Sequence, residues 1–507
     1  MNRRLTLNLG VRFDYYGHLS TVENGQQPLA FFTPGAGSTW GEQVLNGGMK
    51  VRGSNGIATD KAQYRFAPRF GFAWDVFGDG NTAIRGGYAE FSDKVGEYSY
   101  VNNMRTNPPG VGLPTISIYT PGVTLANFSY GISSTTANGG AQGFAPPPGV
   151  SFQVNPNGSF VGTQIGVGGI DPNLKPPLVH SWALGIQHRI SGFMVEATYM
   201  GTASRDLYIQ TDVNRFAGDM IINNGYQARL NPDFGAITYG RSIGLANSDL
   251  AAFSISKHFT KGWTAHAIYT YGKSLDYTSS NDNDNGNGGA ENIYDSANIA
   301  AQYGRANFDS RQRFSGDLVW DIPGFGNRLS HAVTSGWTVA PVIILQSGQP
   351  FSVITSAPYN PNPTPANPVE GDFNADGYDY DAPNTPSFGK HIKASRSDFV
   401  KGVFPLTAFE PINGGTLPWP TYGQEGNLGR NTYDGPGFAV VNMTVERTFK
   451  IPKLGEGGLF EMRGEIFNLF NRVNLAPPNN DMNGSYFGQS TGNSTPRQIQ
   501  LVAHIRF

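Results

Sequence analysis

The residues best suited to metal chemistry lie in one acidic stretch, DFNADGYDYD, at positions 372–381. Oxygen ligands at alternate positions, with glycine at the sixth, are typical of the first half of a calcium loop, because the chain can then wrap around a hard cation. The predicted calcium ligands are Asp372, Asn374, Asp376, the Tyr378 carbonyl, Asp379 and Asp381. Position twelve is Pro383 instead of glutamate, so Asp379 or Asp381 has to supply the second carboxylate. The competing interpretation is an unliganded acidic turn.

A second group of charged side chains alternates with apolar ones, so in β-strands these charges fall on one face. Charges of both signs on neighbouring strands can pair, line a wet interior or contact a domain enclosed by the sheet. The densest series is Glu461, Arg463 and Glu465, and we predict that it makes such interior contacts together with Arg313 and Asp317. The same parity holds for Arg12, Asp14, Arg69, Arg85, Glu196, His504 and Arg506. The competing interpretation is ordinary solvated lining.

Residue types that carry out catalysis are sparse and badly spaced. The chain has no cysteine, and its 8 histidines form no HExxH-like set. It also contains no G-x-S-x-G elbow, no P-loop and no dinucleotide fingerprint. We therefore predict that the protein is not an enzyme. With a formal net charge of -2 and 15% charged residues, nucleic acid is not an expected partner either.

The elements that position these residues are predicted to be antiparallel β-strands. Residues 5–15 alternate strictly between apolar and polar side chains. Residues 496–507 (PRQIQLVAHIRF), which end on Phe507, put their apolar residues mainly on one parity in the same way. About twelve such segments follow one another, and the 66 glycines, 33 phenylalanines and 23 tyrosines favour strands and tight turns. No run of about 18 apolar residues is present, which excludes a transmembrane helix. The predicted fold class is all-β.

The connections between these strands alternate between short and long. Short turns are predicted near 77–81, 191–192 and 260–262, whereas 93–177 and 348–437 are long and rich in proline and glycine. This asymmetry is expected of an outer-membrane β-barrel, which has short periplasmic turns and long extracellular loops. The first strand then runs outward, and the last strand leaves Phe507 at the periplasmic rim.

Aromatic residues at strand ends support the same interpretation. Two belts are predicted at the two membrane interfaces. Trp74, Trp263, Trp320 and Trp337 lie beside the short turns, and Tyr15, Trp182, Tyr199 and Tyr271 lie nearer the long loops. The competing interpretation is a soluble core built from the same aromatic residues.

Four segments carry a resemblance to a known family: FAPRFGFAWDVFGDGNTAIRGGYAEF, HSWALGIQHRISGFMVEATYMGT, FEMRGEIFNLFNRVN and the terminal IRF. Together they resemble the C-terminal barrel of TonB-dependent receptors, and more narrowly the Oar-like receptors that carry a carboxypeptidase-regulatory-like domain. The resemblance implies a barrel of about 22 strands with a plug in its lumen. We expect residues 1–507 to be the C-terminal part of such a barrel, with the plug and signal peptide encoded upstream.

The function that follows is TonB-dependent uptake of a large ligand, such as a glycan, peptide or metal chelate, across a Gram-negative outer membrane. The expected partners are outer-membrane lipid, the TonB complex acting through an upstream plug domain, and an unidentified extracellular ligand. Two alternatives stay open: a surface adhesion or export protein, and a passive porin of about twelve strands.

Overall fold

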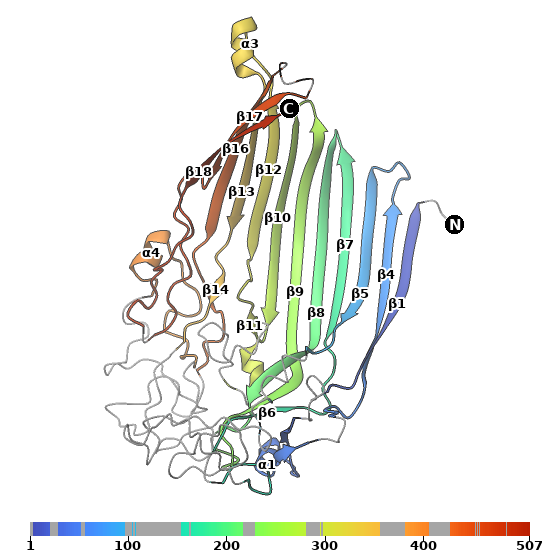
Figure 1. Cartoon of the computed structure of the whole chain (residues 1–507), viewed down its shortest axis with the longest axis vertical. Helices are drawn as coiled ribbons and strands as arrows, with labels where there is room; N and C mark the ends of the chain where they lie inside the picture. The colour runs from blue at the N-terminus through green and yellow to red at the C-terminus, as the bar shows by residue number, and fades with distance from the viewer. Residues whose placement is uncertain are drawn as a thin grey trace.

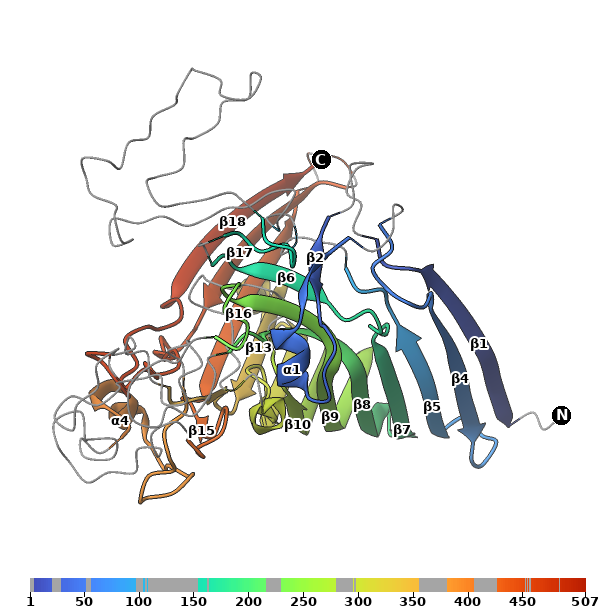
Figure 2. The same ribbon diagram turned by 90° about the horizontal axis from the view of Figure 1, so that it is seen from below.

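The computed structural model contains one large curved antiparallel sheet with irregular segments at one end (Figures 1 and 2). Among the described residues, no helix is long and apolar enough to cross a membrane. The structure describes residues 4–20, 29–51, 56–96, 104, 107, 154–161, 164–215, 229–279, 295, 298–354, 381–404, 426–451, 453, 455, 457–482 and 484–507.

Twelve long strands lie in the sheet in the order in which they occur in the chain, and each pairs antiparallel with the next. They are β1 (Leu5–Gly17), β4 (Gln63–Asp75), β5 (Thr82–Ser92), β7 (Leu178–Ile190), β8 (Phe193–Asp212), β9 (Ile237–Thr260), β10 (Trp263–Asp276), β12 (Gln312–Ile322), β13 (Trp337–Gln346), β16 (Phe438–Lys450), β17 (Leu459–Phe467) and β18 (Gln498–Arg506). The predicted all-β antiparallel architecture is therefore confirmed. Among the described strands, β1 and β18 each have one neighbour, and the sheet is not closed.

One face of this sheet, named here the apolar face, carries most of the exposed large hydrophobic side chains of the long strands. The alternation within each strand assigns them to that face, and the register keeps them aligned: Leu7 lies opposite Phe72, and Leu9 lies opposite Phe70. Leu9 is 71% exposed and Val11 is 70% exposed. A hydrophobic surface of this extent is unfavourable in water and marks contact with lipid or with another protein.

The height of the apolar face matches a membrane. On β10 it reaches from Trp263 to Tyr271, which is about 27 Å along the strand and about 21 Å across a bilayer if the strand is tilted by about 40°. The apolar band of an outer-membrane barrel is about 25 Å tall. After Tyr271 along β10, the next residue on the same face is Lys273, which lies opposite Asp249 and ends the apolar surface.

Short turns lie at one end of the sheet, here named the short-turn end, in the upper part of Figure 1. Two of them have consecutive residues with positive φ, namely Ser191 (48°) with Gly192 (85°) and Lys261 (55°) with Gly262 (81°). This is the geometry of a type I′ turn, whose twist matches that of the paired strands. The connection between β12 and β13 also lies at this end and contains α3 (Arg328–Thr334).

The opposite end, here named the loop end, carries two packed bodies. The first contains β2 (Phe31–Thr33), α1 (Trp40–Leu45), β3 (Gly48–Lys50) and β6 (Val167–Ile170), and β6 pairs parallel with both β2 and β9. The second contains β14 (Pro350–Phe351), α4 (Arg396–Lys401) and β15 (Tyr433–Asp434). The remaining short elements are η2 (Ile299–Gln302) and β11 (Gly304–Arg305).

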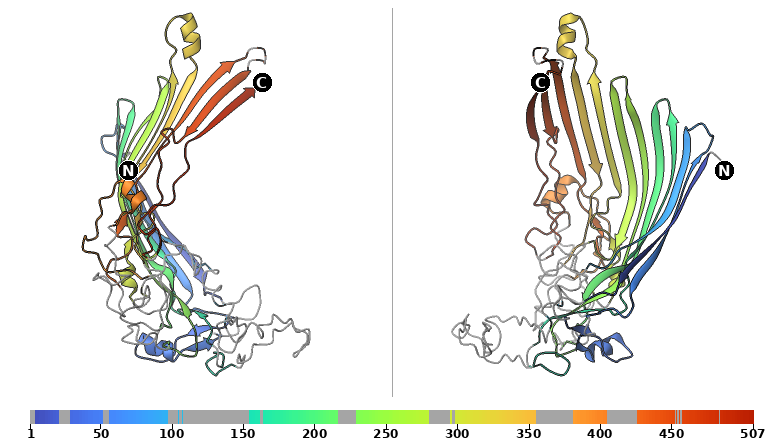
Figure 3. Two further views of the ribbon diagram at one scale, coloured as in Figure 1. Left: turned by 90° about the vertical axis from the view of Figure 1, so that its left-hand side faces the viewer. Right: turned by 45° about the vertical axis from the view of Figure 1, so that its right-hand side comes forward.

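The long connections are therefore more structured than their composition indicated. Phe32, Phe234 and Ile237 are fully buried in the core of the first body. β8 and β9, of 20 and 24 residues, are longer than the sequence pattern predicted, because their loop-end halves pair beyond the apolar face and β9 continues to β6. Figure 3 shows these extensions from two sides.

We expect that Phe253→Arg lowers the free energy of unfolding in lipid vesicles by about 2–4 kcal/mol, because it puts a charge in the middle of the lipid-facing band. Phe253 is 54% exposed and lies opposite Ala197 and Tyr269 on the apolar face. Ser254→Arg is the matched control, since this neighbour faces the other side of the sheet and the change should stay within about 0.5 kcal/mol. Equal losses for the two variants would show that the faces are wrongly assigned.

Candidate functional site

The face opposite the apolar face, here named the wet face, carries the charged residues predicted to make interior contacts. Glu461 lies opposite His504, and Arg463 lies opposite Glu446. On β17 itself, Arg463 Nε is 3.3 Å from Glu465 Oε1. The structure thus places Glu461, Arg463 and Glu465 on one face, where the two glutamates flank the arginine.

Arg313 and Asp317 lie on the same face but at a different place. Both are on β12, where Arg313 is opposite Thr270 and Asp317 is opposite His266. The Asp317 carboxylate is 3.6 Å from His266 Nδ1. Since β13 and β16 separate β12 from β17, the five predicted residues line the wet face at two separate positions.

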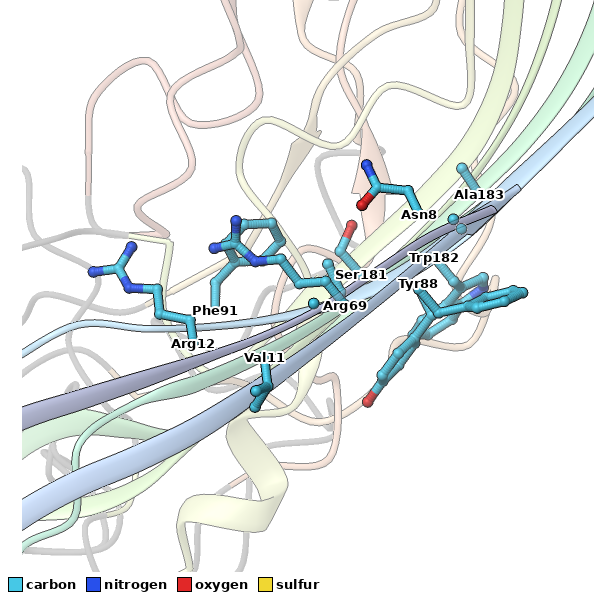
Figure 4. Close-up of a pocket in the computed structure, with 14 residues that line it drawn as sticks. Asn8, Val11, Arg12, Arg69, Tyr88, Phe91, Ser181, Trp182 and Ala183 are labelled. Carbon is cyan, nitrogen blue, oxygen red and sulfur yellow. The ribbon is translucent and has the colours of Figure 1, made fainter. Parts of the chain in front are cut away.

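A groove of about 550 Å³ lies at the other side of the sheet, across β1, β4, β5 and β7 (Figure 4). The side chains of Arg12, Arg69 and Ser181 point to the wet face there, whereas Val11 and Trp182 point to the opposite side. Arg12 Nε donates a hydrogen bond to Asp14 Oδ1 at 2.7 Å. The Arg69 guanidinium lies 5.0 Å from the centre of the Phe91 ring.

Glycines form the floor of this groove. Gly71 lies opposite Asn8 on β1 and opposite Gly87 on β5. A Cβ built at Gly10 meets no atom within 4 Å, and at Gly71 the nearest atoms are 3.8 Å away. The side of the sheet on which Arg12 and Arg69 lie was predictable from the alternation. The groove was not predictable, because it requires the register between strands that are far apart in the sequence.

The aromatic residues predicted to form the belts all lie on the apolar face. At the short-turn end, Trp263 is opposite Trp320, and Lys257 Nζ lies 3.7 Å from the Trp263 ring centre. Towards the loop end, Tyr199 donates a hydrogen bond to Asp249, and Tyr15 lies opposite Tyr64. The register of the strands places the other four belt residues on the apolar face as well: Trp74, Trp337, Trp182 and Tyr271. Phe507, at the short-turn end, is 94% exposed.

The predicted calcium loop falls largely outside the described residues. This applies to Asp372, Asn374, Asp376, Tyr378 and Asp379. Asp381 is described, and it is 1% exposed. Within the described part of the chain, no group of three or more histidines and carboxylates could hold a metal ion.

Ion pairs connect segments at the loop end. Arg430, which is 4% exposed, binds the Asp276 carboxylate at the end of β10 and donates a hydrogen bond to the Gln302 carbonyl at 3.3 Å. Arg305 bridges Asp309 at 2.7 Å and Asp434 at 2.6 Å. Burial lowers the pKa of Arg430 to about 10, so the guanidinium is still charged at neutral pH. These contacts join β10 and β11 to the second packed body.

Comparison with known proteins gives a family match over nearly the whole chain. Residues 1–500 match the family model of the outer membrane beta barrel domain. A search of curated proteins found no match.

Several solved structures resemble the chain. The outer membrane transporter YddB from Escherichia coli is 12% identical over 88% of this chain and 41% of its own, with a TM-score of 0.45. The siderophore receptor PiuA from Acinetobacter baumannii is 9% identical over 99% of this chain and 40% of its own, with a TM-score of 0.39. The FrpB iron transporter from Neisseria meningitidis is 10% identical over 98% of this chain and 42% of its own, with a TM-score of 0.40. The chain spans less than half the length of these three proteins.

We expect Asp276→Ala to destabilise the local structure of the second body by about 3–5 kcal/mol, because it removes a carboxylate that binds the buried Arg430. Hydrogen exchange of residues 426–434 should then become faster, with little change in the strands of the sheet. A combined Asp276→Leu and Arg430→Met variant removes both charges and should restore slow exchange. Unchanged exchange in the single variant would contradict a structural role of this pair.

Proposed function

Because the chain belongs to the outer membrane beta-barrel domain family, we propose that it forms the wall of a receptor that takes up a large ligand across the outer membrane in a TonB-dependent manner. The observation that carries the proposal is the contrast between the two faces of the sheet. The apolar face has the height of a membrane, and the wet face carries charges of both signs that suit an aqueous lumen or a plug.

The packed bodies at the loop end favour a receptor over a simple pore. In the first body, the Asn231 amide donates hydrogen bonds to the Val44 and Leu45 carbonyls at 3.0 and 3.2 Å, joining connections that are far apart in sequence. In the second, Phe351, Phe404 and Tyr433 pack with ring centres 5.1 to 6.0 Å apart. A pore needs no such bodies, whereas a receptor needs preformed extracellular surfaces to capture a ligand.

The two edges of the sheet support the proposal that this chain is part of a larger barrel. Unpaired strand edges are not tolerated in hydrocarbon, since each free N–H and C=O costs several kcal/mol. β1 and β18 must therefore gain hydrogen-bond partners in the membrane. We propose that residues 1–507 are the C-terminal part of an Oar-like receptor, in which upstream barrel strands pair with these edges and an upstream plug connects the barrel to TonB.

Calcium binding by the 372–381 stretch belongs to the same proposal, as a device that orders an extracellular loop. The belt residues are proposed to hold the barrel at the two interfaces of the outer membrane. The glycan, peptide or metal chelate classes of ligand are all compatible with the loop end.

Two other functions compete with uptake. A surface adhesion or export-associated protein would use the same extracellular bodies to bind a partner without moving a solute. A passive porin would require the twelve strands to close on themselves, so that β18 pairs with β1.

Cysteine crosslinking distinguishes the larger barrel from the twelve-strand porin. The natural chain has no cysteine, so introduced pairs react without background. Thr6→Cys with Ala73→Cys is the positive control, because these residues are opposite each other in the β1–β4 register. Thr6→Cys combined in turn with Gln500→Cys, Val502→Cys or His504→Cys should give no disulfide in the outer membrane, since a disulfide needs Cα atoms within about 7 Å. Efficient β1–β18 crosslinking, with steady single-channel conductance, would favour the porin.

Uptake itself is tested by deleting the gene from a strain that carries it. We expect slower growth on at least one glycan, peptide or chelated metal as limiting nutrient, and the same defect when TonB is removed. The control is the deletion strain complemented with the intact gene. Normal uptake together with a defect in surface attachment would support the adhesion alternative.

A further inference from the structure

The groove across β1, β4, β5 and β7 carries an excess of positive charge on the wet face. Arg12 and Arg69 line it, and Arg85 follows on the same face of β5. Among the described residues, the one carboxylate in ion-pair contact with these three arginines is Asp14, which binds Arg12. At another position on the wet face, Arg65 has a carboxylate partner in Asp206, at 2.6 Å.

The positive charge of the groove lies deep in the wall. Gly10 and Arg12 alternate with Leu9 and Val11, whose side chains are on the apolar face and highly exposed. The arginines of the groove therefore lie at the level of the lipid-facing band, not at its polar border. On the lumen side of a barrel wall, charged residues at this depth can contact water and a passing solute.

The two guanidinium groups are arranged to bind an anion. Arg12 uses its Nε for Asp14, and its side chain is 58% exposed, so both terminal nitrogens can reach a solute. Arg69 packs against the half-exposed Phe91 ring, an arrangement that holds the planar group while its N–H edge stays available. Guanidinium groups bind carboxylates and phosphates through paired, charge-assisted hydrogen bonds.

The floor of the groove allows close approach. Gly10, Gly71 and Gly87 put bare backbone where other residues would place side chains, and a Cβ at Gly10 would point into open space. Asn8 and Ser181 add neutral polar groups at its margin. A solute that bears an anionic group can therefore lie against the wall between the arginines.

We propose that this groove is a binding site for an anionic solute, recognised through a carboxylate or phosphate group. This inference rests on the proposed uptake function and adds that the solute moving along the barrel wall is anionic. Its test measures binding in place of uptake, so failure of one does not imply failure of the other.

Binding is measured by equilibrium dialysis on the purified intact receptor that contains this chain, in lipid vesicles, with citrate as the carboxylate probe and inorganic phosphate as the phosphate probe. We expect at least one probe to bind, and the Arg12→Ala, Arg69→Ala double variant to bind it about tenfold more weakly or worse. Arg189→Ala is the matched control, since Arg189 lies on the wet face of β7 outside the groove. This variant should bind the probe with unchanged affinity. Probe binding must also weaken with salt.

A second pair of variants tests the groove without removing charge. Gly71→Val fills the floor and should weaken binding, whereas Gly464→Val, on the apolar face of β17, should not. Heat-modifiable electrophoretic mobility shows that each variant is folded, and Arg69→Lys supplies a milder change with an intermediate loss if folding fails. No binding of either probe to the natural chain, or equal affinity in the groove and control variants, would overturn the proposal.

Discussion

The two-residue period of the β-strand is the constraint on which the whole molecule depends. Each side chain of the twelve long strands is assigned to one of two faces, and the hydrogen-bonded register passes that assignment to the next strand. A slip of one residue anywhere would move hydrophobic residues such as Leu9 from the apolar face to the wet face. Since the two faces meet different solvents, the register is strongly specified, and both the lipid contact and the polar wall follow from it.

Features that depend on this local period could be predicted from the sequence. The alternation identified the strands, and turn signals such as Lys261-Gly262 identified the hairpins. The parity of Arg69 and Glu461 could be assigned in the same way. What could not be predicted depends on contacts between distant segments. The parallel pairing of β6 with β9 has no signal in either strand, and Asp276 and Arg430 are separated by 154 positions.

The charged residues of the molecule divide into two classes with different physical roles. At the loop end, the buried Arg430 and the partly buried Arg305 are matched by carboxylates, so their desolvation cost is offset by ion pairing and they join neighbouring connections. On the wet face near β1, Arg69 is exposed and packs on an aromatic ring without a carboxylate partner among the described residues. The first class is needed for local order, whereas the second remains available to a mobile anion.

The strictly sequential order of the long strands has a consequence for how such walls change in size. Every long strand is hydrogen bonded to its neighbours in the chain, so a hairpin can be gained or lost at either edge without altering any existing register. The circumference of the wall can therefore evolve in steps of two strands by duplication or deletion of short gene segments. A site confined to a few adjacent strands would be inherited intact when hairpins change at the far edge, as the groove across β1, β4, β5 and β7 would be when they change beyond β18.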